Sequence, residues 1–124
     1  MSNTLSKSET VKLYFKCMDT ADFDGALELF APDALYLRSP LGGTPENPFA
    51  ASGVAPVEGR AAIQEFFAQR GKRDTHHQIL VEGESDGHWW GEGEAWVGDS
   101  EKRVFLVHVT FSAEGLIQRF VAIR

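Results

Sequence analysis

The sequence has a single cysteine, Cys17, among its 124 residues. One thiol cannot form an internal disulfide, and without a Cys-x-x-Cys pair the chain has no cysteine motif for zinc binding or thiol redox chemistry. Proteins without disulfides are typical of a reducing compartment, so we expect a cytoplasmic protein.

Long apolar runs and an excess of basic residues are also absent. No apolar stretch approaches the roughly 20 residues that a membrane-spanning helix needs, and the first residues lack the regions of a signal peptide. Eighteen acidic residues against twelve basic ones give a formal net charge of −6. Because polyanions are bound by basic surfaces, we expect neither nucleic acid nor an anionic membrane among the partners.

The residues that are present suffice for one folded unit. Apolar residues make up 43% of the chain and charged residues 24%. A chain of this length and composition can bury a core of its own, which excludes disorder of the whole chain. We therefore predict a single domain over residues 1–124.

The first third of the chain predicts two helices and a strand. Ser6 and Glu9 have the spacing of a capping box, and apolar residues then recur with a helical period, so we expect a helix from about residue 7 to residue 20. Asp22 is expected to cap a short second helix that carries Phe30 and ends near Pro32. A strand is predicted over residues 34–38.

The next segment, residues 39–59, is rich in residues that break regular structure. It holds four of the five prolines and four glycines. A connection of this length without secondary structure is uncommon inside a domain and is typical of a lid or a binding loop, so we predict that it covers a pocket. A third helix is expected over residues 60–70, ended by Gly71.

The last part of the chain predicts β-structure only. Branched and aromatic residues dominate four segments, which are separated by turn-forming residues; the segments are 76–82, 89–97, 103–111 and 116–123. We expect four antiparallel strands in a meander. Helices gathered before a run of antiparallel strands indicate an α+β fold with the helices on one face of the sheet.

This order of elements resembles the cone-shaped fold of the nuclear-transport-factor-2-like (NTF2-like) superfamily. Local sequences are similar to its SnoaL-like members, namely DFDG at 22–25, LFAPDA at 29–34, GRAAI at 59–63 and FSAEGLI at 111–117. The resemblance implies three helices packed on a curved, mostly antiparallel sheet, with an internal pocket for a small hydrophobic ligand. It also implies dimers or trimers, of which we expect a homodimer. The fold alone does not imply an activity.

A more specific resemblance concerns YFKCMD at 14–19 and THH at 75–77. These segments resemble the bile-acid 7α-dehydratase and scytalone dehydratase branch, in which an aspartate of the first helix pairs with a strand histidine and a tyrosine lines the pocket. The resemblance places these catalytic roles on Asp19, His77 and Tyr14. It implies an acid–base lyase or isomerase that requires no cofactor.

The sequence also departs from these relatives. The tyrosine that the dehydratases carry on the first strand matches Arg38, and a second pocket histidine has no counterpart. Steroid isomerases of this fold have aspartates where this chain has the segment Arg38-Ser39-Pro40 and Val107. The departures disfavour the mechanism of those isomerases.

An aspartate that accepts a hydrogen bond from one imidazole nitrogen leaves the other nitrogen to move protons near neutral pH. The alternatives are that Asp19 only begins a turn and that Tyr14 only packs in the core. His76 is the alternative to His77, because neighbouring strand residues point to opposite faces. If His77 points inward, Ile79 and Val81 are expected to do so too.

Four further residues are candidates for substrate binding: Tyr36, Arg38, His76 and Arg124. Arg38 either lies in solvent or anchors a carboxylate or carbonyl group. We predict no metal, because zinc requires three or four convergent ligands and a histidine pair on one strand supplies fewer. Solvent or subunit-interface positions are expected for His88 and His108.

The predicted function is a dehydratase-type or isomerase-type enzyme acting on a small hydrophobic oxygenated ring compound, steroid-like or polyketide-like. Two alternatives stay open. One is a non-catalytic ligand-binding or dimerisation module, and the other is a polyketide cyclase or epoxide hydrolase. A cavity with Tyr14 and His77 on its wall favours an enzyme, whereas an interior filled by phenyl rings favours the module.

Overall fold

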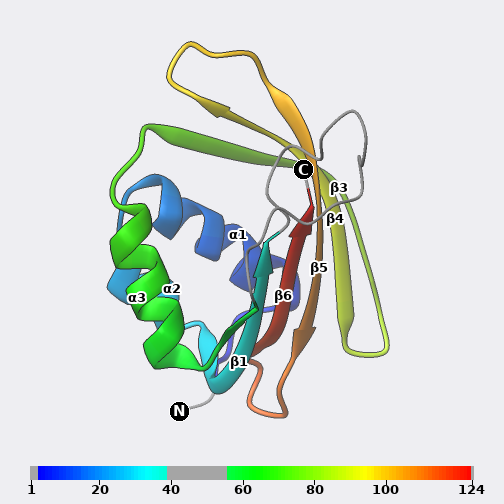
Figure 1. Ribbon diagram of the computed structural model, residues 1–124. Helices are drawn as coiled ribbons and strands as arrows, with labels where there is room; N and C mark the ends of the chain where they lie inside the picture. The colour runs from blue at the N-terminus through cyan, green and yellow to red at the C-terminus, as the bar shows by residue number, and fades with distance from the viewer. Residues whose placement is uncertain (1–2, 39–55, 124) are drawn as a thin grey trace, which may run out of the picture.

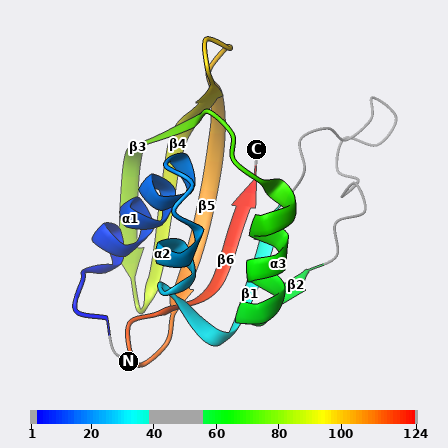
Figure 2. The ribbon, with the colours of Figure 1, turned by 90° about the vertical axis from the view of Figure 1, so that its left-hand side faces the viewer.

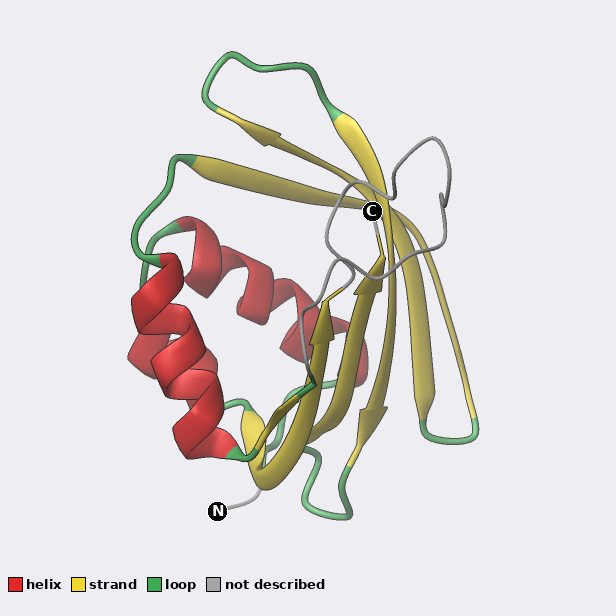
Figure 3. Cartoon of the chain, in the orientation of Figure 1, coloured by secondary structure: helices red, strands yellow, loops and turns green. Residues whose placement is uncertain are grey.

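The computed structural model describes residues 3–38 and 56–123, except for the side chain of Arg38. Three helices lie on one face of a curved sheet (Figures 1 and 3). Their order is α1 (Lys7–Asp19), α2 (Phe23–Leu27), β1 (Phe30–Arg38), β2 (Val57–Glu58), α3 (Arg60–Arg70), β3 (Thr75–Ser85), β4 (His88–Val97), β5 (Arg103–Phe111) and β6 (Ile117–Ile123). The predicted α+β class is confirmed.

The sheet of the described residues has six strands in the order β2-β1-β6-β5-β4-β3. Strands β3 to β6 form the predicted antiparallel meander. The pair between β1 and β6 is parallel, so the sheet is mostly antiparallel. In Figure 2 the helices lie in front of the sheet, and their packing covers its concave face.

The capping residues that predicted the first and third helices are present in the structure. Ser6 accepts a hydrogen bond from the backbone of Glu9, whose side chain accepts one from the backbone of Ser6, so the capping box is confirmed. Helix α3 spans the predicted residues, and Gly71 after it has φ 67°, a conformation that favours glycine. Within the described residues, no helix is both long enough and apolar enough to cross a membrane.

The prediction for the second helix is wrong at its end. Helix α2 stops at Leu27, and Phe30 begins β1. The cause is non-local, because Phe30 pairs with Ile117 of β6. Pro32 lies within β1, where the register to β6 shifts. A proline is tolerated in a strand at such an irregularity, because the ladder does not require its missing N–H.

The predicted loop over residues 39–59 also ends earlier than expected. Val57 and Glu58 form β2, which pairs antiparallel with Leu35 and Tyr36 of β1. Residues 39–55 lie outside the described residues, so the predicted lid stays a prediction.

An irregularity in β3 reverses the expected orientation of Val81. The pairing with β4 shifts between Ile79 and Val81. Such a bulge turns the following residues to the opposite face. Ile79 packs against the core, whereas Val81 is 64% exposed and lines a groove on the convex face. The expectation that Val81 shares the face of His77 is therefore wrong.

A glycine permits the close approach of β3 and β4 beside this bulge. Gly93 pairs with Ile79, and a Cβ atom on it would lie 2.2 Å from the carbonyl oxygen of Gln78. Any other residue would force the two strands apart, which explains a glycine within a strand.

The core between the helices and the sheet is aromatic. Tyr14 and Phe67 come from the helices, and the strands contribute Phe30, Tyr36 and Phe120. Their rings form a connected set of contacts with centroid distances of 4.7–6.4 Å. Such ring packing adds specific geometry to the burial of apolar area and holds the helices on the sheet.

Candidate active site

The last residue of α1 contacts the beginning of β3. Asp19 Oδ1 lies 2.6 Å from Nδ1 of His77, and Asp19 Oδ2 accepts a hydrogen bond of 2.9 Å from the backbone N–H of His77. The carboxylate is thereby held at both oxygens. This geometry brings Asp19 and His77 together, as the resemblance implied, and their acid–base roles stay a prediction.

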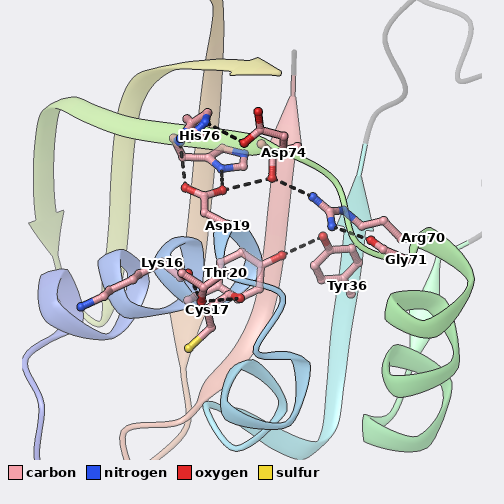
Figure 4. A network of polar contacts seen from close by, with 12 residues as sticks. Lys16, Cys17, Asp19, Thr20, Tyr36, Arg70, Gly71, Asp74 and His76 are labelled. Atoms are coloured by element: carbon pink, nitrogen blue, oxygen red, sulfur yellow. Dashed lines mark hydrogen bonds and ion pairs between the residues drawn. The ribbon is translucent and has the colours of Figure 1, made fainter. Parts of the chain in front are cut away.

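A second polar layer holds the carboxylate in place, as Figure 4 shows. The hydroxyl of Thr75 donates a 3.2 Å hydrogen bond to Asp19 Oδ1, and Arg70 Nη2 donates a 3.2 Å hydrogen bond to that hydroxyl. Arg70 also donates to the carbonyl oxygen of Gly71. The network therefore connects the end of α3, the start of β3 and the end of α1.

Aromatic packing fixes the plane of the imidazole. The ring of Phe15 stacks on His77 at a centroid distance of 4.7 Å, and Phe105 meets it edge-on at 5.6 Å. The side chain of His77 is 5% exposed and that of Asp19 is 18% exposed. A largely buried, hydrogen-bonded pair keeps one orientation, which a proton-transfer group requires.

The two tyrosines that the sequence suggested meet inside the cone. The hydroxyl groups of Tyr14 and Tyr36 are 2.9 Å apart, and both residues are buried. Tyr14, Tyr36 and His77 line one internal cavity, together with Arg70.

The size of that cavity bears directly on what it can hold. Its volume is about 20 Å³, which is space for about one water molecule. A second hollow of about 380 Å³ opens between α1 and β3, with Asp19, Phe15 and Lys16 on its wall. His77 lines both spaces. Tyr14 lines the small cavity and Asp19 lines the larger hollow, consistent with the rotation of about 140° that five helical residues impose.

Comparison with known proteins identifies the family. The SnoaL-like domain matches residues 11–120. The chain belongs to the SnoaL-like domain family. No curated protein matched the sequence.

Solved structures with the same fold have diverse descriptions. A protein provisionally assigned as a ketosteroid isomerase from Kribbella flavida DSM 17836 is 18% identical, with a TM-score of 0.68, and the match covers 94% of this chain and 76% of that one. The epoxide hydrolase/cyclase-like enzyme SalBIII of salinomycin pyran-ring formation is 19% identical, with a TM-score of 0.71 and coverages of 94% and 88%. A computationally designed 17-OHP binder is 17% identical, with a TM-score of 0.72 and coverages of 96% and 91%. At these identities the likeness shows the NTF2-like fold.

Among the other predicted binding residues of this SnoaL-like protein, His76 has a described side chain, and it points away from the pair. His76 is exposed, stacks on Trp96 at 5.4 Å and contacts Asp74 at 3.1 Å. It therefore occupies the face opposite to His77, which answers the question of orientation. The side chain of Arg38 and the whole of Arg124 lie outside the described residues. Within the described residues, no group of three or more potential metal ligands converges.

Two residues of the network were not identified from sequence. Arg70 looks like an ordinary basic residue in the last turn of a helix, where it complements the helix dipole. Thr75 looks like a strand residue. The only signal was their position, since Thr75 directly precedes the histidine pair and Arg70 ends the helix before it.

The convex face of the sheet carries a second group of histidines. His88 Nδ1 lies 2.8 Å from His108 Nε2, and Trp90 stacks on both rings. Burial, His88 and Arg119 lower the pKa of His108 from its ordinary value of 6.5, with burial the largest cause. Trp90 and His108 line an apolar groove of about 400 Å³, and the expected solvent or subunit-interface position of His88 and His108 stays a prediction.

The lowered pKa of His108 predicts a loss of stability in acid. Below pH 6.5 the unfolded chain binds a proton at this residue more readily than the folded chain does, so the free energy of unfolding falls as the pH decreases. We expect His108→Gln to reduce the difference between urea midpoints measured at pH 7.5 and at pH 5. His76→Gln, at an exposed position, is the control. An unchanged difference in His108→Gln would contradict the expectation.

Proposed function

We propose that this SnoaL-like protein is a cofactor-independent acid–base enzyme of the dehydratase or isomerase type. Its substrate is a small hydrophobic oxygenated ring compound, steroid-like or polyketide-like, and residues 1–124 act as one domain. The observation that carries the proposal is the 2.6 Å contact between Asp19 and a largely buried His77 beside the hydroxyl pair of Tyr14 and Tyr36. This arrangement provides a base, a group that orients it and hydrogen-bond donors for an oxyanion.

The proposed steps use the two nitrogens of His77 differently. Asp19 accepts the Nδ1–H hydrogen bond, which assigns proton exchange to Nε2. Nε2 takes a proton from the carbon next to a substrate carbonyl, and the tyrosine pair donates a hydrogen bond to the developing enolate oxygen. The enolate then reforms its carbonyl and expels the β-hydroxyl group, which leaves as water with the proton from Nε2.

Substrate entry requires the aromatic interior to open. About 20 Å³ is free between Tyr14, Tyr36, His77 and Phe120, far less than a ring compound needs. Binding therefore has to separate the rings of α1 and α3 from those of the sheet. The hydrogen-bonded pair at the wall is already formed, so only the apolar part of the site has to rearrange.

The small free volume of the interior also favours a second candidate function. A cone interior packed with phenyl rings fits a non-catalytic ligand-binding or dimerisation module. Cyclase or epoxide hydrolase chemistry would use similar pocket residues, and the similarity to SalBIII is compatible with it. A turnover assay separates the module from the enzymes, and product identity separates the enzymes from one another.

The experiment that tests the proposal monitors formation of a conjugated enone. Purified protein is incubated with a fused-ring β-hydroxy ketone and, separately, with a Δ5-3-ketosteroid, because elimination of water and isomerisation both yield an enone that absorbs in the ultraviolet. We expect enone formation above the buffer rate, abolished in His77→Gln. Rates equal to those of His77→Gln with every ring compound tested would favour the non-catalytic module.

We also propose that the convex face of the sheet forms a homodimer. Large apolar side chains lie exposed on it, namely Val81, Trp90, Val104, Leu106 and Ile123. A contiguous exposed patch of this kind is typical of an interface. Leu106→Glu is expected to yield a monomer in light scattering, because it would bury an unpaired charge. Val97→Glu is the control, since Val97 is equally exposed, at 50%, and lies outside the groove. A monomeric wild type would contradict the proposal.

A further inference from the structure

We infer that Arg103 anchors an anionic group of the substrate, so that the ring compound carries a carboxylate or a similar anion. The inference rests on the proposed function, because it assigns the reacting end of the substrate to His77. It starts from the register of three neighbouring strands. His77 on β3 pairs with Ala95 on β4, and Ala95 pairs with Arg103 on β5.

Directly paired residues point to the same face of a sheet. His77, Ala95 and Arg103 therefore form one row across the sheet, on the face that carries the imidazole. Adjacent strands are about 4.8 Å apart, so the backbones of His77 and Arg103 are separated by roughly 10 Å. The buried residue between them is an alanine, whose single methyl group leaves the centre of the row open.

A hollow lies along this row. It has a volume of about 130 Å³, and His77, Ala95 and Arg103 all line it. A cavity of about 150 Å³ holds a benzene ring in another protein. The hollow is slightly smaller than that cavity but is open to its surroundings, so it accommodates a short acidic chain or part of one ring of the substrate. The imidazole lies at one end of the hollow and the guanidinium group at the other.

The charges around the hollow favour an anion at Arg103. The ion pairs found among the described residues involve Lys12, His76 and His77, and none includes Arg103. Its guanidinium group has a planar set of donors that matches a carboxylate with two parallel hydrogen bonds. Glu101 also lines the hollow, and its carboxylate opposes a bound anion, so removing that charge should strengthen binding.

The test uses benzoate and its neutral analogue benzamide as probes, titrated into the isotope-labelled full chain and followed by NMR. We expect benzoate to shift the signals of His77, Ala95 and Arg103 and to bind at least fivefold more tightly than benzamide. Arg103→Gln should weaken benzoate binding about five- to tenfold without changing benzamide binding. Glu101→Gln should strengthen benzoate binding two- to threefold.

The control variant is Arg73→Gln, which removes the same charge from an exposed residue between α3 and β3. Equal benzoate affinity in Arg103→Gln and Arg73→Gln, with both variants folded by circular dichroism, would overturn the inference, as would benzoate shifts confined to the convex face. This experiment measures binding and not turnover. If benzoate binds at the row but the protein forms no enone, the proposed function is refuted and the inference about Arg103 stands.

Discussion

Asp19→Asn is expected to lower kcat/KM for enone formation by about 10²–10⁴-fold, the usual contribution of a positioned general acid–base group. The asparagine keeps the size of the side chain but removes the negative charge that stabilises a protonated imidazole. The carboxylate also accepts hydrogen bonds from the backbone N–H of His77 and from the hydroxyl of Thr75. The change therefore weakens the orientation of His77.

The control for this experiment is Asp22→Asn, which makes the same chemical change three residues away. Asp22 caps α2 by accepting a hydrogen bond from the backbone of Gly25. Asparagine is an equally good N-cap, so this replacement should change stability little and leave kcat/KM within about twofold. The double variant Asp19→Asn/His77→Gln should be no slower than His77→Gln, because residues that act as a unit are not additive. Equal activity of Asp19→Asn and the wild type would show that the pair is structural.

Phe67→Ala is expected to lower the free energy of unfolding by about 3–5 kcal/mol, the usual range for removal of a buried phenylalanine. Phe67 is fully buried and its ring contacts those of Tyr14, Phe30 and Tyr36. The cavity left behind lies between α3 and the sheet and cannot collapse without moving the helix. Urea unfolding at pH 7.5 measures the effect as a shift of the midpoint.

The neighbouring residue supplies the control. Phe66 is only partly buried, so Phe66→Ala should cost less than Phe67→Ala, although the same number of atoms is removed. A smaller loss in Phe67→Ala than in Phe66→Ala would mean that the packing of α3 on the sheet differs from the one described. Unequal slopes of the two unfolding curves would instead indicate a changed unfolded state.

The parts of the fold that were predictable depend on local physics. The capping box at Ser6, the glycine after α3 and the turn residues between the last strands act within a few positions, so one sequence suffices to place α1, α3 and the meander. The end of α2 was not predictable, because Phe30 is drawn into β1 by pairing with Ile117, a residue far along the chain. The bulge in β3 lies beside the close approach of Gly93 to Gln78, a contact between two strands that no local pattern predicts.

Some residues of the site were likewise identified from the sequence, and others were found only in the structure. The resemblance of two short segments to known dehydratases selected Tyr14, Asp19 and His77, and the structure brings Asp19 and His77 into contact. No pattern in the chain pointed to Arg70 or Thr75, whose hydrogen bonds extend the pair to α3. These contacts arise only when three separate elements meet.

From its residues alone, the chain specified an acidic α+β protein with helices on one face of a sheet, because caps, periodicity and charge act locally. The tertiary structure decided which histidine points inward, which side chains hold its aspartate and how little space the aromatic interior leaves. Those properties depend on strand register and on ring packing between distant segments, which no single stretch of sequence contains.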